Sequence, residues 1–365
     1  MCIYLIVDVI LLIFCWIYNC HKKGTLFFSC FIFFCLMVAH NGQFNMMCDY
    51  TNYMNLFLGK ASIYGNINTS SGYDLEMPFY YFLKFLRIFP IIPFIYILAI
   101  GIMFCTPLFF LIKKESNNPP LSLFYLMVLN NASLYLFFFS AHRQMLATVF
   151  LLWAYIIYKY ARSKYKNIIT ILFVLLGLFS HSSSYFVIPI ALMLYFIKLP
   201  TKKYLYIIVA ISLILGLFFR NLIAEHFSNF LILFGDNENV ARSTHYLFDD
   251  VFGDQKTYEF TALPPMALLI IFFIYHYKKM ELQQYTVKCW ICAFILYLSL
   301  SSIPLINRAV LLFFLLGIVG GIPLSIRKLN VKKQFLVVSL LFLYIAYRAY
   351  NRPEYILLPY KFFFE

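Results

Sequence analysis

The chain has 365 residues, of which 63% are apolar and 12% are charged, and its formal net charge is +14. A composition this apolar excludes a soluble globular protein and predicts an all-α, polytopic integral membrane protein. Basic loops on the cytoplasmic side of a membrane account for most of the positive charge, so nucleic acid is excluded as a partner.

Apolar runs separated by charged turns predict about 12 transmembrane helices, which form a single integral membrane domain over residues 1–365. Two long loops, 40–90 and 220–261, connect predicted helices on the same side of the membrane. The predicted spans are 2–19, 25–39, 91–112, 120–139, 144–158, 167–180, 184–198, 204–219, 262–276, 286–300, 305–323 and 334–347.

The basic residues are divided unequally between the two sides. One set of loops holds most of the 29 lysines and arginines, including Lys113, Lys114, Lys288 and the turn 159–166. Short basic loops lie in the cytoplasm, so both long loops face outward. The outer loops are richer in arginine, whose forked guanidinium suits phosphate oxygens. This asymmetry predicts a phosphorylated, anionic substrate on the outer side; the alternative is that these arginines pair with outer carboxylates for folding.

The first outer loop ends in Phe82–Pro90, where apolar and basic residues fall on opposite sides of a short helix. This pattern is typical of an interfacial or re-entrant segment. The second outer loop carries His226 and His245, which could be general bases or simply solvated side chains. Their spacing does not match a metal site, so we expect no metal.

Residues 140–192 contain two short apolar segments, Met145–Tyr158 and Asn167–Ser180, joined by a basic turn. Each segment spans about 21 Å as a helix, against about 30 Å for the hydrocarbon core of a bilayer. Arg143 and His181 flank the far ends of the two segments, so we expect both below the outer membrane interface. An arginine at that depth needs water, a partner or an anionic ligand.

This stretch carries a family resemblance. His142, Arg143 and Gln144, followed by a short span, a basic turn and Leu178–Ser184, resemble the paired RQ and H-S motifs of one group of membrane proteins. That group is the EpsG-like branch of the bacterial O-antigen and exopolysaccharide polymerases, the Wzy type. The resemblance extends to the first outer loop of that family, through Asp49, Tyr53 and Glu76–Tyr80 of this chain. It also extends to the family's late arginine at the start of a helix, through Arg308.

The resemblance implies a GT-C-like architecture, similar to that of lipid-dependent membrane glycosyltransferases, in the bacterial inner membrane. It implies that a growing glycan moves from undecaprenyl diphosphate to the non-reducing end of a lipid-linked repeat unit on the periplasmic side. The partners are then undecaprenyl-diphosphate-linked oligosaccharide and membrane lipid. A chain-length regulator protein is a further candidate partner. No cofactor and no nucleotide sugar are expected.

Cleavage of the bond between sugar and phosphate develops negative charge on the diphosphate, which positioned arginines can stabilise without a metal. We therefore expect Arg143 and Arg308, with Gln144, to bind the diphosphates.

The acceptor hydroxyl needs a base or an oriented hydrogen-bond partner. His181 is the first choice, because it faces Arg143 across the hairpin. Its alternative role is to cap the end of a span by binding free backbone carbonyls. The other candidates are carboxylates of the first outer loop: Asp49, Asp74 and Glu76.

Three other functions stay open at this point. A lipid-linked oligosaccharide flippase also needs basic groups for the diphosphate, but it binds that group from both faces and often has repeated halves. An O-antigen ligase shares the lipid carrier and the outer site and differs only in the acceptor. A structural membrane scaffold does not predict arginines concentrated on the outer side.

Overall fold

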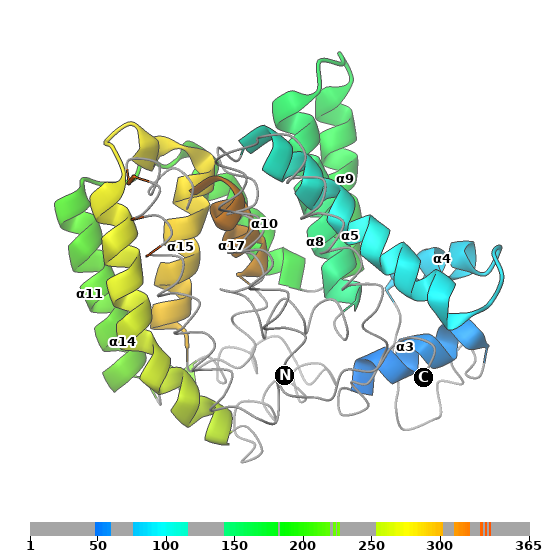
Figure 1. Ribbon diagram of the computed structural model, residues 1–365, viewed down its shortest axis with the longest axis horizontal. Helices are drawn as coiled ribbons and strands as arrows, with labels where there is room; N and C mark the ends of the chain where they lie inside the picture. The colour runs from blue at the N-terminus through cyan, green and yellow to red at the C-terminus, as the bar shows by residue number, and fades with distance from the viewer. Residues whose placement is uncertain are drawn as a thin grey trace. The chain divides into compact units, whose positions relative to one another are not determined.

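The computed structural model describes residues 48–59, 76–115, 142–181, 183–219, 253–301 and 310–321, with a few isolated positions between 222 and 226 and between 329 and 336. All regular elements in these described ranges are helices (Figure 1), which confirms the all-α prediction. The predicted spans 2–19, 25–39 and 120–139 lie outside the described residues, so the count of 12 stays a prediction.

The chain divides into two compact units, one of residues 1–188 with 329–365 and one of residues 189–328. The described helices of the first unit are α3 (Cys48–Leu58), α4 (Met77–Leu86), α5 (Pro93–Glu115), α8 (His142–Tyr160) and α9 (Lys166–Ser180). Helix α10 (Ser183–Phe196) begins in the first unit and ends in the second.

Helix α5 is the described helix that is long and apolar enough to cross a membrane. It begins two residues after the start of the predicted span 91–112 and carries Lys113 and Lys114 in its last turn. Its 23 residues extend about 35 Å at 1.5 Å per residue, which exceeds the hydrocarbon thickness of a bilayer. Helices α9, α10, α15 (Tyr285–Ser299) and the segment Leu263–His276 are apolar but shorter.

Helices α8 and α9 pack side by side as a hairpin (Figure 1). Gly177 allows their close approach, because a Cβ atom there would lie 2.9 Å from the side chain of Leu151. Helix α8 has 19 residues and begins at His142, so it is longer than the predicted span 144–158. Arg143 is therefore the second residue of this helix rather than a residue that precedes it.

A polar cluster joins the C-terminal ends of α5 and α8. The Glu115 carboxylate accepts hydrogen bonds from the hydroxyls of Tyr155 and Tyr160 and pairs with the ammonium group of Lys159. Burial raises the pKa of the Tyr160 hydroxyl, and its bond to Glu115 adds to that shift. The cluster places the basic ends of the two helices together.

The second unit is built from α11 (Lys202–Phe218), α14 (Gly253–His276), α15, α17 (Leu311–Leu316), the short 3-10 helix η2 (Glu281–Gln283) and the π-helical turn η3 (Gly317–Gly321). Helix α14 starts within the predicted loop 220–261. The described part of the predicted span 305–323 consists of α17 and η3.

Glycines set the helix contacts of the second unit. A Cβ atom at Gly216 of α11 would lie 2.0 Å from the backbone oxygen of Leu298 in α15. At Gly317 it would lie 2.6 Å from the Cβ atom of Trp290. Such small residues are typical of helix interfaces in membrane proteins, where they let backbones approach closely.

Lys288 differs from its predicted place in a cytoplasmic loop. It lies within α15 and is 6% exposed. Its ammonium group donates hydrogen bonds to the carbonyl oxygens of Leu194 and Ile197 at the C-terminal end of α10. A cation is stabilised at this end of a helix by the carbonyls that have no partner within the helix.

Candidate active site

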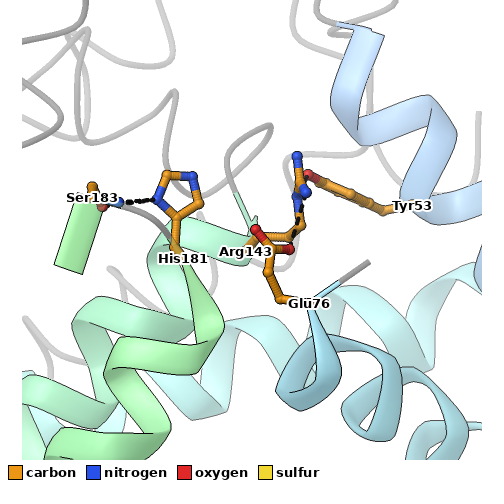
Figure 2. Close-up of polar contacts among 5 residues, drawn as sticks. All are labelled: Tyr53, Glu76, Arg143, His181 and Ser183. Carbon is orange, nitrogen blue, oxygen red and sulfur yellow. Dashed lines mark hydrogen bonds and ion pairs between the residues drawn. The ribbon is translucent and has the colours of Figure 1, made fainter. Parts of the chain in front are cut away.

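Arg143 and His181 lie at the same end of the α8–α9 hairpin (Figure 2). Arg143 is in the first turn of α8, and His181 directly follows the last residue of α9. Two antiparallel helices joined by a short turn bring the start of one beside the end of the other. The connection by residues 161–165 is thus what places the two side chains near each other.

The guanidinium of Arg143 is held from two sides (Figure 2). Its Nε atom donates to the hydroxyl oxygen of Tyr53 at 2.7 Å, and its Nη1 atom pairs with the Oε2 atom of Glu76 at 3.0 Å. The side chains of Arg143 and Glu76 are 19% and 27% exposed, so solvent reaches both members of the pair. The contacts with Tyr53 and Glu76 offset the cost of removing the guanidinium charge from water.

A buried aromatic cluster supports this arginine. The ring of Tyr53 lies in edge contact with Phe79 of α4 and close to the ring of His142 in α8. The His142 Nδ1 atom shares a 2.6 Å hydrogen bond with the hydroxyl of Tyr96 in α5, and both side chains are buried. Four helices therefore fix the position of Tyr53, and through it the direction of the Arg143 fork.

His181 makes hydrogen bonds to the start of α10. Its Nδ1 atom lies 3.1 Å from the backbone nitrogen of Ser183 and 2.8 Å from the Ser183 hydroxyl. A backbone N–H can only donate, so Nδ1 acts as the acceptor and the proton of the neutral ring lies on Nε2. Gln144 donates to the same Ser183 hydroxyl at 3.3 Å, which connects α8 to the start of α10.

This geometry makes His181 a helix cap, but of a different kind from the predicted alternative, because the ring accepts from an N–H of α10 and these bonds involve no free carbonyl of α9. Ser183 is the first residue of α10, and its N–H has no partner within that helix. The imidazole of His181 supplies one. The ring therefore joins the end of α9 to the beginning of α10 and has a single preferred tautomer.

The remaining predicted residues are described only in part. Asp49 lies in the first turn of α3. Asp74 and Arg308 lie outside the described residues. The structure thus brings Arg143 and Glu76 together, and joins Gln144 to the His181 group through Ser183.

Arg87 lies in the predicted outer loop 40–90, but its contacts differ from the predicted role of outer arginines in binding a phosphorylated substrate. Its Nε atom donates to the carbonyl oxygen of Phe57 at 3.1 Å, and its Nη2 atom donates to that of Leu56. These carbonyls end α3, just before Gly59, whose φ of 75° terminates the helix. Arg87 is a helix-capping residue: the partners given by these contacts are backbone carbonyls, not the outer carboxylates of the folding alternative.

Sequence patterns pointed to Arg143 and His181 but missed the roles of Tyr53, Tyr96 and Ser183. Tyr53 stood out only as part of the resemblance, and tyrosines are common in this chain. Among the described residues, no group of three or more His, Cys, Asp and Glu side chains could hold a metal ion.

Comparison with known proteins gives a match to a protein family. A family model, that of the EpsG family, matches residues 24–362. No curated protein matches the chain, and no solved structure matches it.

Proposed function

The chain belongs to the EpsG family, whose model covers nearly its whole length, and on this basis we propose that it is a surface-polysaccharide polymerase. It transfers a growing glycan from undecaprenyl diphosphate to the non-reducing end of a lipid-linked repeat unit. It does so on the periplasmic side of the bacterial inner membrane, as a single domain of about 12 transmembrane helices with a GT-C-like architecture.

The observation that carries this proposal is the half-buried Arg143 at the start of α8. Its guanidinium is oriented by Tyr53 and paired with a carboxylate that solvent can reach. A carboxylate oxygen and a phosphate oxygen make the same charge-assisted contact with a guanidinium. Glu76 therefore occupies a place that an anionic group of the substrate can take.

In the proposed reaction, a hydroxyl oxygen of the acceptor sugar attacks the anomeric carbon of the donor. The bond between that carbon and the diphosphate oxygen breaks, and its electron pair stays on the diphosphate. Arg143, together with Arg308, stabilises the charge that develops there. Arginine supplies this charge without proton exchange, because its guanidinium stays protonated.

The hydroxyl proton passes to the carboxylate of Glu76. When the diphosphate displaces Glu76 from Arg143, the carboxylate oxygens of Glu76 become available. They can then accept the proton of the acceptor hydroxyl. The first outer loop contributes two further carboxylates, Asp49 and Asp74, as alternative proton acceptors.

His181 acts in this proposal through its Nε2–H as a hydrogen-bond donor to a substrate oxygen. Its Nδ1 atom already accepts from the Ser183 N–H, so protonation there would break an existing bond. This favours Glu76 over His181 as the base. Gln144 contributes indirectly, because it holds the Ser183 hydroxyl that binds the imidazole.

The test is to delete the gene and analyse the cell's surface polysaccharide on a gel. A polymerase defect leaves a single repeat unit attached to its acceptor, because export and ligation still operate. Loss of even that single unit would identify a flippase or a ligase instead. Complementation with the Arg143→Ala chain, at equal abundance in the membrane, should give the same pattern as the deletion.

A further inference from the structure

The outer face of α4 is apolar and exposed. Met77, Tyr81 and Phe85 recur every four residues along the helix, and Ile88 and Phe89 follow its end. These five side chains are between 47% and 77% exposed. Single exposed apolar residues are ordinary, but a continuous patch marks a surface that contacts something else.

The opposite face of the same helix is part of the core. Phe79, Leu83 and Leu86 are almost fully buried, and at 100° per residue they lie across the helix from Met77, Tyr81 and Phe85. The helix is therefore apolar on both faces. Its one charged residue, Lys84, lies at the edge of the exposed face, and its sequence has no acidic residue.

We propose that this exposed face, with the following segment 88–92, docks on the outer leaflet of the membrane. Aromatic side chains beside a lysine are typical of segments that lie at the membrane interface. The patch also leads directly into α5, which begins at Pro93 and is long and apolar enough to cross the bilayer. This continuity with a helix that can cross the bilayer favours lipid over a second protein as the occupant.

The docked helix has a direct connection to the candidate site. Glu76 immediately precedes α4 and occupies its N-cap position, and its carboxylate pairs with Arg143. Lipid contact along α4 thereby sets the depth, relative to the membrane surface, of the ion pair between Glu76 and Arg143. The docking itself does not depend on the proposed function, whereas this consequence for the reaction does.

The test uses the full-length protein with p-benzoylphenylalanine in place of Phe85, reconstituted in nanodiscs of synthetic phospholipid without isoprenoid. After irradiation, mass spectrometry of the α4 peptide should show a phospholipid adduct. The same probe at Tyr165 is the matched control, because that side chain is similarly exposed but lies in the polar turn before α9. It should give a several-fold lower yield of lipid adduct.

A cross-link from position 85 to a second protein chain, or equal lipid yields at positions 85 and 165, would overturn the proposal. So would a phospholipid adduct that disappears when isoprenoid diphosphate is added, because the face would then bind the substrate tail. If the labelled chain does not accumulate, Phe85→Trp in bilayers of brominated lipid reports the same contact. Its fluorescence should be quenched more strongly than that of Tyr165→Trp.

Discussion

Arg143 makes two directed contacts that only a forked side chain can make together. Nε reaches the Tyr53 hydroxyl, and Nη1 reaches Glu76. Lysine carries the same charge but has one nitrogen on a flexible stem. Replacing Arg143 by lysine therefore tests whether the site needs only a positive charge or specifically a guanidinium.

We expect Arg143→Lys to reduce polymerisation about 10- to 100-fold, because loss of one charge-assisted hydrogen bond costs about 1.5–3 kcal/mol. The measurement is the rate of chain growth from purified lipid-linked repeat units. Tyr53→Phe is the matched control: it keeps the ring beneath the guanidinium, at 5.8 Å, and removes one acceptor, so its effect should be smaller. Normal activity of Arg143→Lys would contradict a forked contact with phosphate.

The tautomer of His181 gives a second residue-scale prediction. Glutamine can place an N–H donor near the position of Nε2, whereas asparagine can place an acceptor near that of Nδ1. If His181 acts as a donor, His181→Gln retains measurable polymerisation, and His181→Asn folds normally but is inactive. The chain lengths of polymer in cells and the amount of protein in the membrane separate these outcomes. Inactivity of both variants at normal abundance would favour His181 as the base.

The positions of Arg143 and His181 could be predicted because both depend on local spacing across one hairpin. Their partners could not. Tyr53 lies 90 residues before Arg143, and Glu76 lies 67 residues before it. Such contacts depend on how α3 and α4 pack against α8, and no periodicity in the sequence specifies that packing.

At the scale of elements, the helices of the second unit depend on glycine contacts. A Cβ atom at Gly216 would meet the backbone of α15 at 2.0 Å, so α11 would have to move away. At Gly177 the nearest atom belongs to the flexible Leu151 side chain, which can rotate. The two glycines therefore differ in how well their surroundings can adapt.

We expect Gly216→Ala to lower the free energy of unfolding by about 1–3 kcal/mol through overpacking. Gly177→Ala should lower it by less. The comparison is made by thermal unfolding of the purified full-length protein in detergent. An equal loss of stability in the two variants would show that the close approach of α11 to α15 is not required.

The sequence also shows where element-scale prediction stops. Apolar runs predicted the central part of α5, α8, α9, α11 and α15, because membrane helices need continuous apolar residues. They missed α3 and the extent of α4, which are short and lie in a predicted loop. They also missed the burial of Lys288, because its aliphatic stem fits a helix interface while its ammonium group binds carbonyls.

At the scale of the whole molecule, α8 connects two charged groups. Arg143 pairs with Glu76 near its start, and Lys159 pairs with Glu115 near its end. The two basic residues are about 24 Å apart along the helix at 1.5 Å per residue, less than the thickness of the hydrocarbon core. In the proposed orientation Lys159 lies at the cytoplasmic interface, so Arg143 would lie at or just below the outer one, within reach of the proposed lipid-linked diphosphate.

This arrangement requires that the turn after α8 faces the cytoplasm. In intact cells with a permeabilised outer membrane, a membrane-impermeant maleimide should label His226→Cys, which lies in the predicted outer loop. Ser163→Cys, in the basic turn, should be labelled only after lysis, with the unsubstituted chain as background in both cases. Both side chains are exposed, so differences in burial do not decide the result. The reverse pattern would place Arg143 and His181 toward the cytoplasm, and a polymerase acting from the periplasmic side would then be wrong.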